Sequence, residues 1–272
     1  MMAVRACAAL AAGLALAAGA AEAAVFTWTF RGVMTSGYDA TGLFGVAGAD
    51  LTGLHWTAVV RTNTAAPGAV IENGGVYTRI DGFGELTPVK VDFTLNGVSR
   101  RLGVPPQGPA FEINAGASGR QLQLDGVLPG FDFDEFLVIQ ASNSGSFVSG
   151  DLTRRFEEEI ELLGAGVGLD FLPGPDFTTL PSLTAPPPGA FLGGSMTFHY
   201  SDFDRTTQVE TVFYDAYGQM RILSITAGAV PEPATWATMI AGLGVAGAMA
   251  RRRYRFGRNA TSVLPPTCPN EA

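Results

Sequence analysis

Hydrophobic and polar residues alternate through most of the chain between residues 25 and 229. The pattern is clearest at Phe26, Trp28 and Phe30, which polar residues separate. Successive side chains of a strand point to opposite faces of a sheet, so the alternation predicts half-buried strands. About nine or ten short strands are expected, and the segments that carry the pattern are 26–31, 54–62, 76–80, 90–95, 121–125, 136–141, 196–201, 209–214 and 220–226. Gly, Pro and Asn clusters separate them, which predicts a mostly β domain of the β-sandwich or jelly-roll type.

One segment, Leu152–Leu163, has helical spacing instead. Phe156, Ile160 and Leu163 would share one face of a helix, and glutamates would surround them. These are Glu157, Glu158, Glu159 and Glu161. The sequence therefore predicts one short surface helix, and the proline-rich residues 173–189 predict an extended loop.

The first 24 residues are typical of a secretory signal peptide. Arg5 precedes an uncharged, Ala-rich run over residues 6–21, and small residues follow at Ala23 and Ala24. We expect signal peptidase to cleave there, which would export a β-rich domain formed by residues 25–229. A buried N-terminal helix is the alternative, but an Ala-rich helix without a polar face would need burial on every side.

A second apolar run, residues 234–250, contains 17 residues without a charge. At 1.5 Å per residue it would reach about 26 Å, the short limit for a transmembrane helix. Five arginines lie within residues 251–258 and predict that this side is cytoplasmic. We therefore expect a single-pass protein with residues 25–229 outside and a disordered cytoplasmic tail over residues 259–272.

The segment 230–237, V-P-E-P-A-T-W-A, stands in front of that run. Pro231 and Pro233 hold the backbone extended, which suits a peptide that lies in an enzyme's groove. Trp236 would lie at the level of the lipid headgroups, where indole rings are enriched.

This motif, the Gly/Ala-rich helix and the arginine cluster closely resemble the PEP-CTERM protein-sorting signal, in its P-E-P-x-x-W-A variant. The resemblance covers residues 230–258, and the chain continues further than the family pattern usually does. It implies recognition by exosortase, an integral-membrane transpeptidase-like enzyme of Gram-negative bacteria that make exopolysaccharide, and removal of the tail after transit. It also implies a recognition and processing element at Pro231, Glu232 and Pro233, an interfacial anchor at Trp236, and a membrane-retention cluster at Arg251, Arg252, Arg253 and Arg255.

Charge and cysteine content narrow the function classes. The chain has 17 Lys+Arg and 25 Asp+Glu, for a net charge of −8, and residues 25–230 alone have 11 against 22, for −11. Nucleic-acid binding needs a basic face to neutralise phosphates, so we expect no nucleic-acid partner. Both cysteines, Cys7 and Cys268, lie outside the exported domain, so its stability must come from packing rather than from disulfides.

Few residues suggest catalysis or metal binding. His55 and His199 both lie in predicted strands, and the sequence has no G-x-S-x-G, H-E-x-x-H or phosphate-binding loop motif. Acidic pairs could supply calcium ligands or the carboxylates of a glycosidase, although none has the spacing of a calcium loop. We expect a solvated acidic surface and no cofactor, with calcium as the alternative. The weak metal candidates are Asp132, Asp134 and Glu135, and the other acidic pairs are Asp202 with Asp204 and Asp170 with Asp176.

A Gly-punctuated segment, residues 37–51, resembles a loop in the exported domains of similarly sorted proteins. We interpret it as a hairpin connection in which Asp39 caps a turn, with a binding role as the alternative.

Two functions fit these observations. The first is a non-enzymatic exported protein of the cell surface or exopolysaccharide matrix, with extracellular polysaccharide as a partner. The alternative is a carbohydrate-binding module or carbohydrate-active enzyme that uses the same sorting tail. Aromatic rings exposed on one sheet face, such as Trp28, Trp56 or Tyr200, would favour sugar binding, and two carboxylates about 5 to 9 Å apart would favour hydrolysis.

Overall fold

The computed structural model describes residues 25–104, 115–127, 133–166, 172, 174–175, 177 and 182–229. Twelve strands are formed within these residues, together with one short 3-10 turn, η1 (Gly84–Leu86). The strands are β1 (Val25–Asp39), β2 (Ala49–Asp50), β3 (His55–Asn63), β4 (Val70–Asn73), β5 (Tyr77–Phe83), β6 (Val89–Leu95), β7 (Val98–Leu102), β8 (Ala115–Asp125), β9 (Glu135–Ser149), β10 (Leu152–Gly166), β11 (Phe191–Asp204) and β12 (Val209–Ala229).

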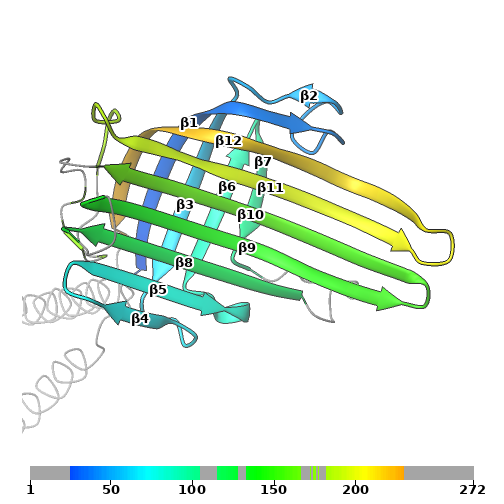
Figure 1. The fold of residues 1–272 in the computed structure, drawn as a ribbon, viewed down its shortest axis with the longest axis horizontal. Helices are drawn as coiled ribbons and strands as arrows, with labels where there is room; N and C mark the ends of the chain where they lie inside the picture. Colours follow the sequence, from blue (N-terminus) through cyan, green and yellow to red (C-terminus); the bar gives the residue numbers. More distant parts are fainter. Residues whose placement is uncertain are drawn as a thin grey trace, which may run out of the picture. The chain divides into compact units, whose positions relative to one another are not determined.

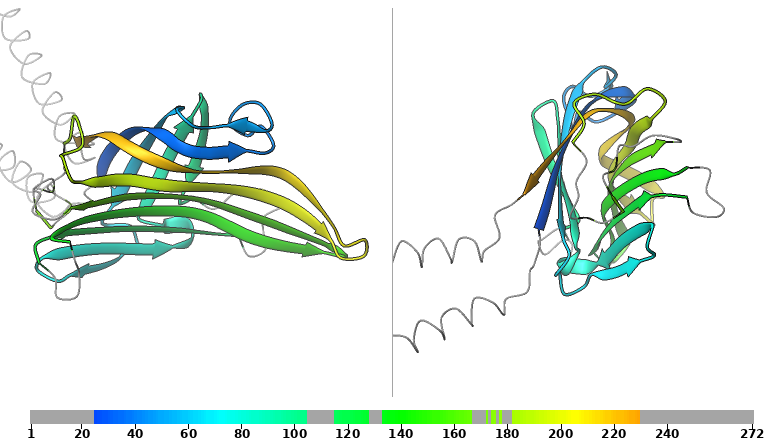
Figure 2. Two further views of the ribbon diagram at one scale, coloured as in Figure 1. Left: turned by 45° about the horizontal axis from the view of Figure 1, so that its top comes forward. Right: turned by 90° about the vertical axis from the view of Figure 1, so that its left-hand side faces the viewer.

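All strands belong to one antiparallel sheet, in the order β4-β5-β8-β9-β10-β11-β12-β1-β3-β6-β7, with β2 added beside β1. The sheet curls, so that β1, β3, β6 and β7 lie across the inner face of β8–β12 (Figure 1 and Figure 2). Across the interior, β6 contacts β8 and β9, and β7 contacts β9 and β10. The predicted mostly β domain is confirmed, and its two layers are parts of a single curled sheet.

The core between the layers is aromatic at its centre. The rings of Phe44 and Phe198 meet edge to face at 5.2 Å, and Phe93 stacks on Phe198 at 6.1 Å. Trp28 and Trp56 are only 0% and 2% exposed. Neither tryptophan can therefore present a ring to a sugar, and both stabilise the fold by burying large apolar surfaces.

The predicted helix over Leu152–Leu163 is wrong, because this segment forms most of β10. Phe156, Glu158, Ile160 and Leu162 are buried in alternation, as expected for one face of a strand. A glutamate stands at one of these inward positions, which hid the period of two in the sequence. Glu158 can be buried because β9 and β12 supply hydrogen-bond donors to its two carboxylate oxygens.

Asp39 caps the connection after β1, as its sequence context predicts. This buried carboxylate accepts hydrogen bonds from the backbone N–H groups of Gly42, Leu43 and Phe44, at 2.8, 2.8 and 2.7 Å. The cap directs the Phe44 side chain into the core, where it is fully buried. Segment 37–51 therefore has a structural role in this domain.

Other predicted features lie outside the described residues. They are the signal peptide over residues 1–24, the transmembrane helix over residues 234–250 and the tail over residues 259–272. Within the part of the chain that the structure describes, no helix has the length and apolar character needed to cross a membrane.

Candidate functional site

The inner sheet face continues past the layer that covers it. β1 and the residues just after it pair with β12 from Ala229 back to residue 215, so the beginning of β12, residues 209–214, pairs with β11 alone. The β9–β10 and β11–β12 hairpins extend beyond the ends of β1, β3, β6 and β7 (Figure 2). On this stretch the side chain of Phe213 is exposed.

A β-bulge gathers aromatic rings on this surface. Tyr200 pairs with Tyr214, but the next residue, Ser201, pairs with Val212, which leaves Phe213 as the extra residue. The ring of Tyr200 consequently lies 4.8 Å from that of Phe213 and 5.3 Å from that of Tyr214. Bulges of this kind re-aim side chains and are frequent beside functional sites.

An arginine–aspartate pair lies beside these rings. Arg154 Nε and Nη2 donate to Asp202 Oδ1 and Oδ2 at 2.7 and 2.9 Å, and the guanidinium lies 5.5 Å from the centre of the Tyr200 ring. The hydrogen bond that Arg154 donates to Asp202 raises the pKa of Arg154, and burial raises the pKa of Tyr200. Because the pair is bidentate, the guanidinium and the carboxylate are held in a fixed orientation relative to each other.

A second set of hydrogen-bonded polar side chains lies next to the aromatic rings, centred on Glu158. Tyr214 donates to Glu158 Oε1 at 2.9 Å, and Asn143 Nδ2 donates to Glu158 Oε2 at 3.1 Å. Arg100 of β7 lies 3.9 Å from Glu158 Oε1 and 5.1 Å from the centre of the Tyr214 ring. We call the whole set the distal cluster, which comprises Arg100, Asn143, Arg154, Glu158, Tyr200, Asp202, Phe213 and Tyr214.

The phenol of Tyr214 gives the cluster a measurable pH dependence. We expect Tyr214→Phe to lower the free energy of unfolding by about 1 kcal/mol near neutral pH, because one buried hydrogen bond is lost. Burial and the Glu158 carboxylate raise the pKa of Tyr214 above its ordinary value of 10.0. Its contribution is therefore fully present below about pH 10 and is lost as the pH rises toward the folded-state pKa.

The difference between wild type and Tyr214→Phe should accordingly shrink as the pH is raised above about 10. Urea denaturation at neutral and at alkaline pH measures this difference in stability. Tyr217→Phe, which alters an exposed tyrosine, is the control. A difference that stays constant across this range would contradict the linkage.

Three side chains on the outer face are arranged like a Ser-His-Asp catalytic triad, namely Ser201, His199 and Asp215. Ser201 Oγ lies 3.1 Å from His199 Nε2, and His199 Nδ1 lies 3.5 Å from Asp215 Oδ1. However, Ser201 is completely buried, and its hydroxyl donates to Glu210 Oε1 at 2.7 Å. The hydroxyl must then accept from His199, whereas a nucleophile has to give its proton to the histidine. We interpret the group as a structural network.

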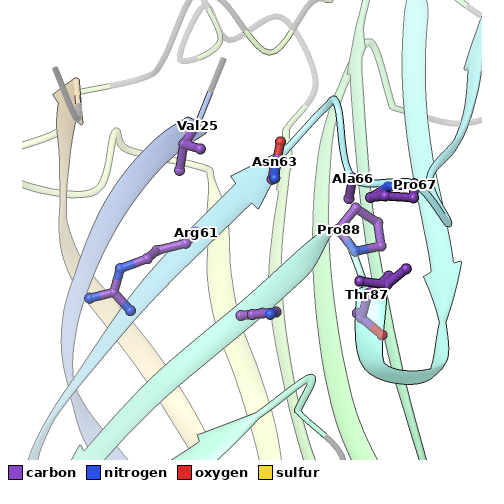
Figure 3. Close-up of a pocket in the computed structure, with 9 residues that line it drawn as sticks. Val25, Arg61, Asn63, Ala66, Pro67, Thr87 and Pro88 are labelled. Atoms are coloured by element: carbon purple, nitrogen blue, oxygen red, sulfur yellow. The ribbon is translucent and has the colours of Figure 1, made fainter. Parts of the chain in front are cut away.

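The described domain also has a small pocket of about 240 Å³ at the opposite end of β1 (Figure 3). Val25, Pro67 and Pro88 supply apolar surface, and Arg61 lines it as well. The Arg61 guanidinium is already paired with Asp92. The volume is below the range of about 300 to 1,000 Å³ that is usual for small-molecule sites, so we place the candidate site at the distal cluster.

The metal candidates are not gathered into a site in the described residues. The backbone oxygen of Asp134 accepts from Gly126 N at 2.7 Å, and the buried Glu135 Oε2 accepts from Leu172 N at 3.3 Å. Asp132 lies outside the described residues. Among those that are described, no three His, Cys, Asp or Glu side chains are placed to hold a metal ion.

Sequence reasoning singled out Tyr200 and Asp202 of the distal cluster but did not bring them together. It missed the roles of Arg154, Phe213 and Tyr214. One local signal was available: Val212, Phe213 and Tyr214 interrupt the alternation of apolar and polar residues. Such an interruption within a strand is typical of a bulge.

Comparisons with known proteins concern the segment that follows β12. The family model described as the PEP-CTERM protein-sorting motif matches residues 229–253. The chain carries a PEP-CTERM sorting motif. No curated protein matches this chain. No solved structure matches it either.

The PEP-CTERM motif begins at Ala229, the residue with which β12 ends. The match includes Pro231, Glu232, Pro233 and Trp236, together with the first three arginines of the predicted retention cluster, and it stops before Arg255. The PEP-CTERM motif implies export, membrane-associated sorting and processing by exosortase. These residues lie outside the described part of the structure.

Proposed function

We propose that this chain is a non-enzymatic protein of the cell surface or exopolysaccharide matrix. Signal peptidase would remove residues 1–24, and exosortase would process the chain at its PEP-CTERM motif. The observation that carries the proposal is the motif itself, which follows the last strand of the β domain without an intervening linker. Processing there would release or reattach the domain without cutting into its sheet.

The geometry of the acidic residues supports a non-enzymatic role. Glu158 pairs with Phe198 in the sheet, and Asp202 lies four residues further along β11. At the rise of a strand this places their backbones about 13 Å apart, on separate parts of the inner face. Each carboxylate also has its own hydrogen-bond donors. These observations disfavour a glycosidase function for the distal cluster.

Intact-mass analysis of the protein from its own host, with and without the exosortase gene, tests the proposal. We expect the residues beyond the Pro231 region to be missing only when exosortase is present. Replacing Pro231, Glu232 and Pro233 together by alanine should abolish this loss, because the extended recognition element is then destroyed. Replacing Pro265 and Pro266, which lie beyond the motif, is the matched control and should leave processing unchanged.

A full-length mass that retains Arg251–Arg255 in the presence of exosortase would overturn the proposal. The protein would then be a simple single-pass anchor. Tail removal that continues in the strain without exosortase would overturn it as well, since a different protease would be responsible.

A further inference from the structure

We propose that the distal cluster binds a neutral pyranose glycan. The inference deepens the proposed function, because it rests on the export of the domain to a polysaccharide environment, and it names the chemical class of the partner. Three features of the cluster carry it: an aromatic platform whose Phe213 ring is half exposed, a fixed pair of charged groups beside that platform, and the absence of net charge in the cluster.

The platform is formed by Phe213 and Tyr200. Phe213 is 49% exposed, although it lies beside Tyr200 on the sheet face that forms the core elsewhere. The C–H groups on one face of a hexopyranose are apolar and carry partial positive charge, so they pack on the negative face of an aromatic ring. The bulge interrupts the regular pairing of β11 with β12. As a result, Phe213 lies next to Tyr200.

Arg154 and Asp202 supply directional hydrogen bonding beside the platform. Their side chains are mutually fixed by two hydrogen bonds, at 2.7 and 2.9 Å, yet both remain partly accessible, at 27% and 13%. A guanidinium has five N–H donors and a carboxylate has about four acceptor positions, so their two mutual hydrogen bonds saturate neither group. A pair of adjacent sugar hydroxyls can donate to the carboxylate and accept from the guanidinium.

Charge selects a neutral glycan over an acidic one. Arg100 and Arg154 are balanced by Glu158 and Asp202, so the cluster has no net formal charge. Residues 25–230 have a net charge of −11, which would repel a polymer rich in uronic acids or sulfates. The aromatic platform and the balanced pair therefore fit neutral hexose units.

A microarray of neutral gluco-, manno- and galacto-oligosaccharides, with polyuronate oligosaccharides alongside, tests the inference on the full chain in detergent. We expect binding to neutral oligosaccharides that Phe213→Ala weakens at least about tenfold, the effect of a few lost stacking and apolar contacts. The matched control is Tyr217→Ala, because Tyr217 is also on β12 and is 53% exposed but is paired with Tyr38 instead. It should leave affinity within about twofold.

Asp202→Asn provides a second variant. It keeps the shape of the side chain but removes the charged acceptor, and it should also weaken binding, while thermal unfolding verifies that each variant is folded. Absence of binding to neutral oligosaccharides, binding to polyuronates alone, or equal losses in Phe213→Ala and Tyr217→Ala would overturn the inference. Self-association through this face, abolished by Phe213→Ala in the absence of glycan binding, would overturn it too.

Failure of this inference is distinguishable from failure of the proposed function. The array uses the unprocessed chain and reports on the domain, whereas the mass analysis reports on the sorting motif. A glycan-negative protein can still lose its tail to exosortase, and an unprocessed protein can still bind glycans.

Discussion

Gly32→Ala is expected to destabilise the β domain by about 4 kcal/mol, beyond the usual cost of overpacking. Gly32 lies in β1 between β3 and β12, next to a register shift in the β1–β12 ladder. An added Cβ would lie 2.0 Å from the backbone oxygen of Arg221 and 2.5 Å from the Trp56 ring. Relief would require separating β1 from β12 and moving a buried indole, because neither neighbour is the end of a flexible chain.

Chemical denaturation followed by tryptophan fluorescence measures this loss, since Trp56 itself is buried at the clash. Gly228→Ala is the matched control, because Gly228 pairs with Thr27 in the same ladder and its added Cβ would have its nearest neighbour at 3.7 Å. It should change stability by no more than about 0.5 kcal/mol. Equal stabilities for the two variants would show that the strands are not packed as described.

The strands with one buried and one solvated face could be predicted from sequence. β1, β3, β6 and β11 all contain long stretches of alternation, and each was predicted within a few residues or in part. β4 was missed because all four of its residues are exposed, so an edge strand of this kind has no hydrophobic period. The two predicted segments 209–214 and 220–226 are parts of one strand, β12, which the extra residue Phe213 makes irregular.

The order of strands in the sheet could not be predicted from local pattern. β1 pairs with β12, which comes last in the described chain, and that pairing joins β8–β12 to β1, β3, β6 and β7 in one sheet. Alternation specifies which face of a strand is buried but does not identify its neighbour. Consequently the mostly β class was predictable, whereas the single curled sheet was not.

The sorting motif could be predicted from the sequence, whereas the distal cluster could not. A linear peptide is recognised through consecutive residues, so Pro231, Glu232 and Pro233 could be identified without any tertiary structure. The distal cluster takes residues from β7, β9, β10, β11 and β12, and it depends on the register of those strands and on one bulge. Its residues could be noticed singly, as Tyr200 was, but their proximity required the fold.

Glu158→Ala is expected to lower the free energy of unfolding by about 3 kcal/mol. The carboxylate accepts from Tyr214 and Asn143 and lies beside Arg100, and its removal would leave buried donors without an acceptor. Arg100 Nε is buried and has no hydrogen-bond partner among the described residues. Removal of Glu158 would also take away the counter-charge that lies near this guanidinium. Glu158→Gln should recover part of the stability, because an amide oxygen can still accept one of these bonds.

Glu157→Ala is the control that decides between the two structures considered for this segment. In β10, Glu157 is exposed on the outer face, so its loss should change stability by no more than about 0.5 kcal/mol. In the helix predicted from sequence, both glutamates would lie on the solvated side, and both substitutions would be nearly neutral or slightly stabilising, since alanine favours helix. Urea denaturation of the two variants therefore measures the inward position of Glu158 directly. Near-neutral effects at both positions would contradict the strand and, with it, the contacts that hold the distal cluster together.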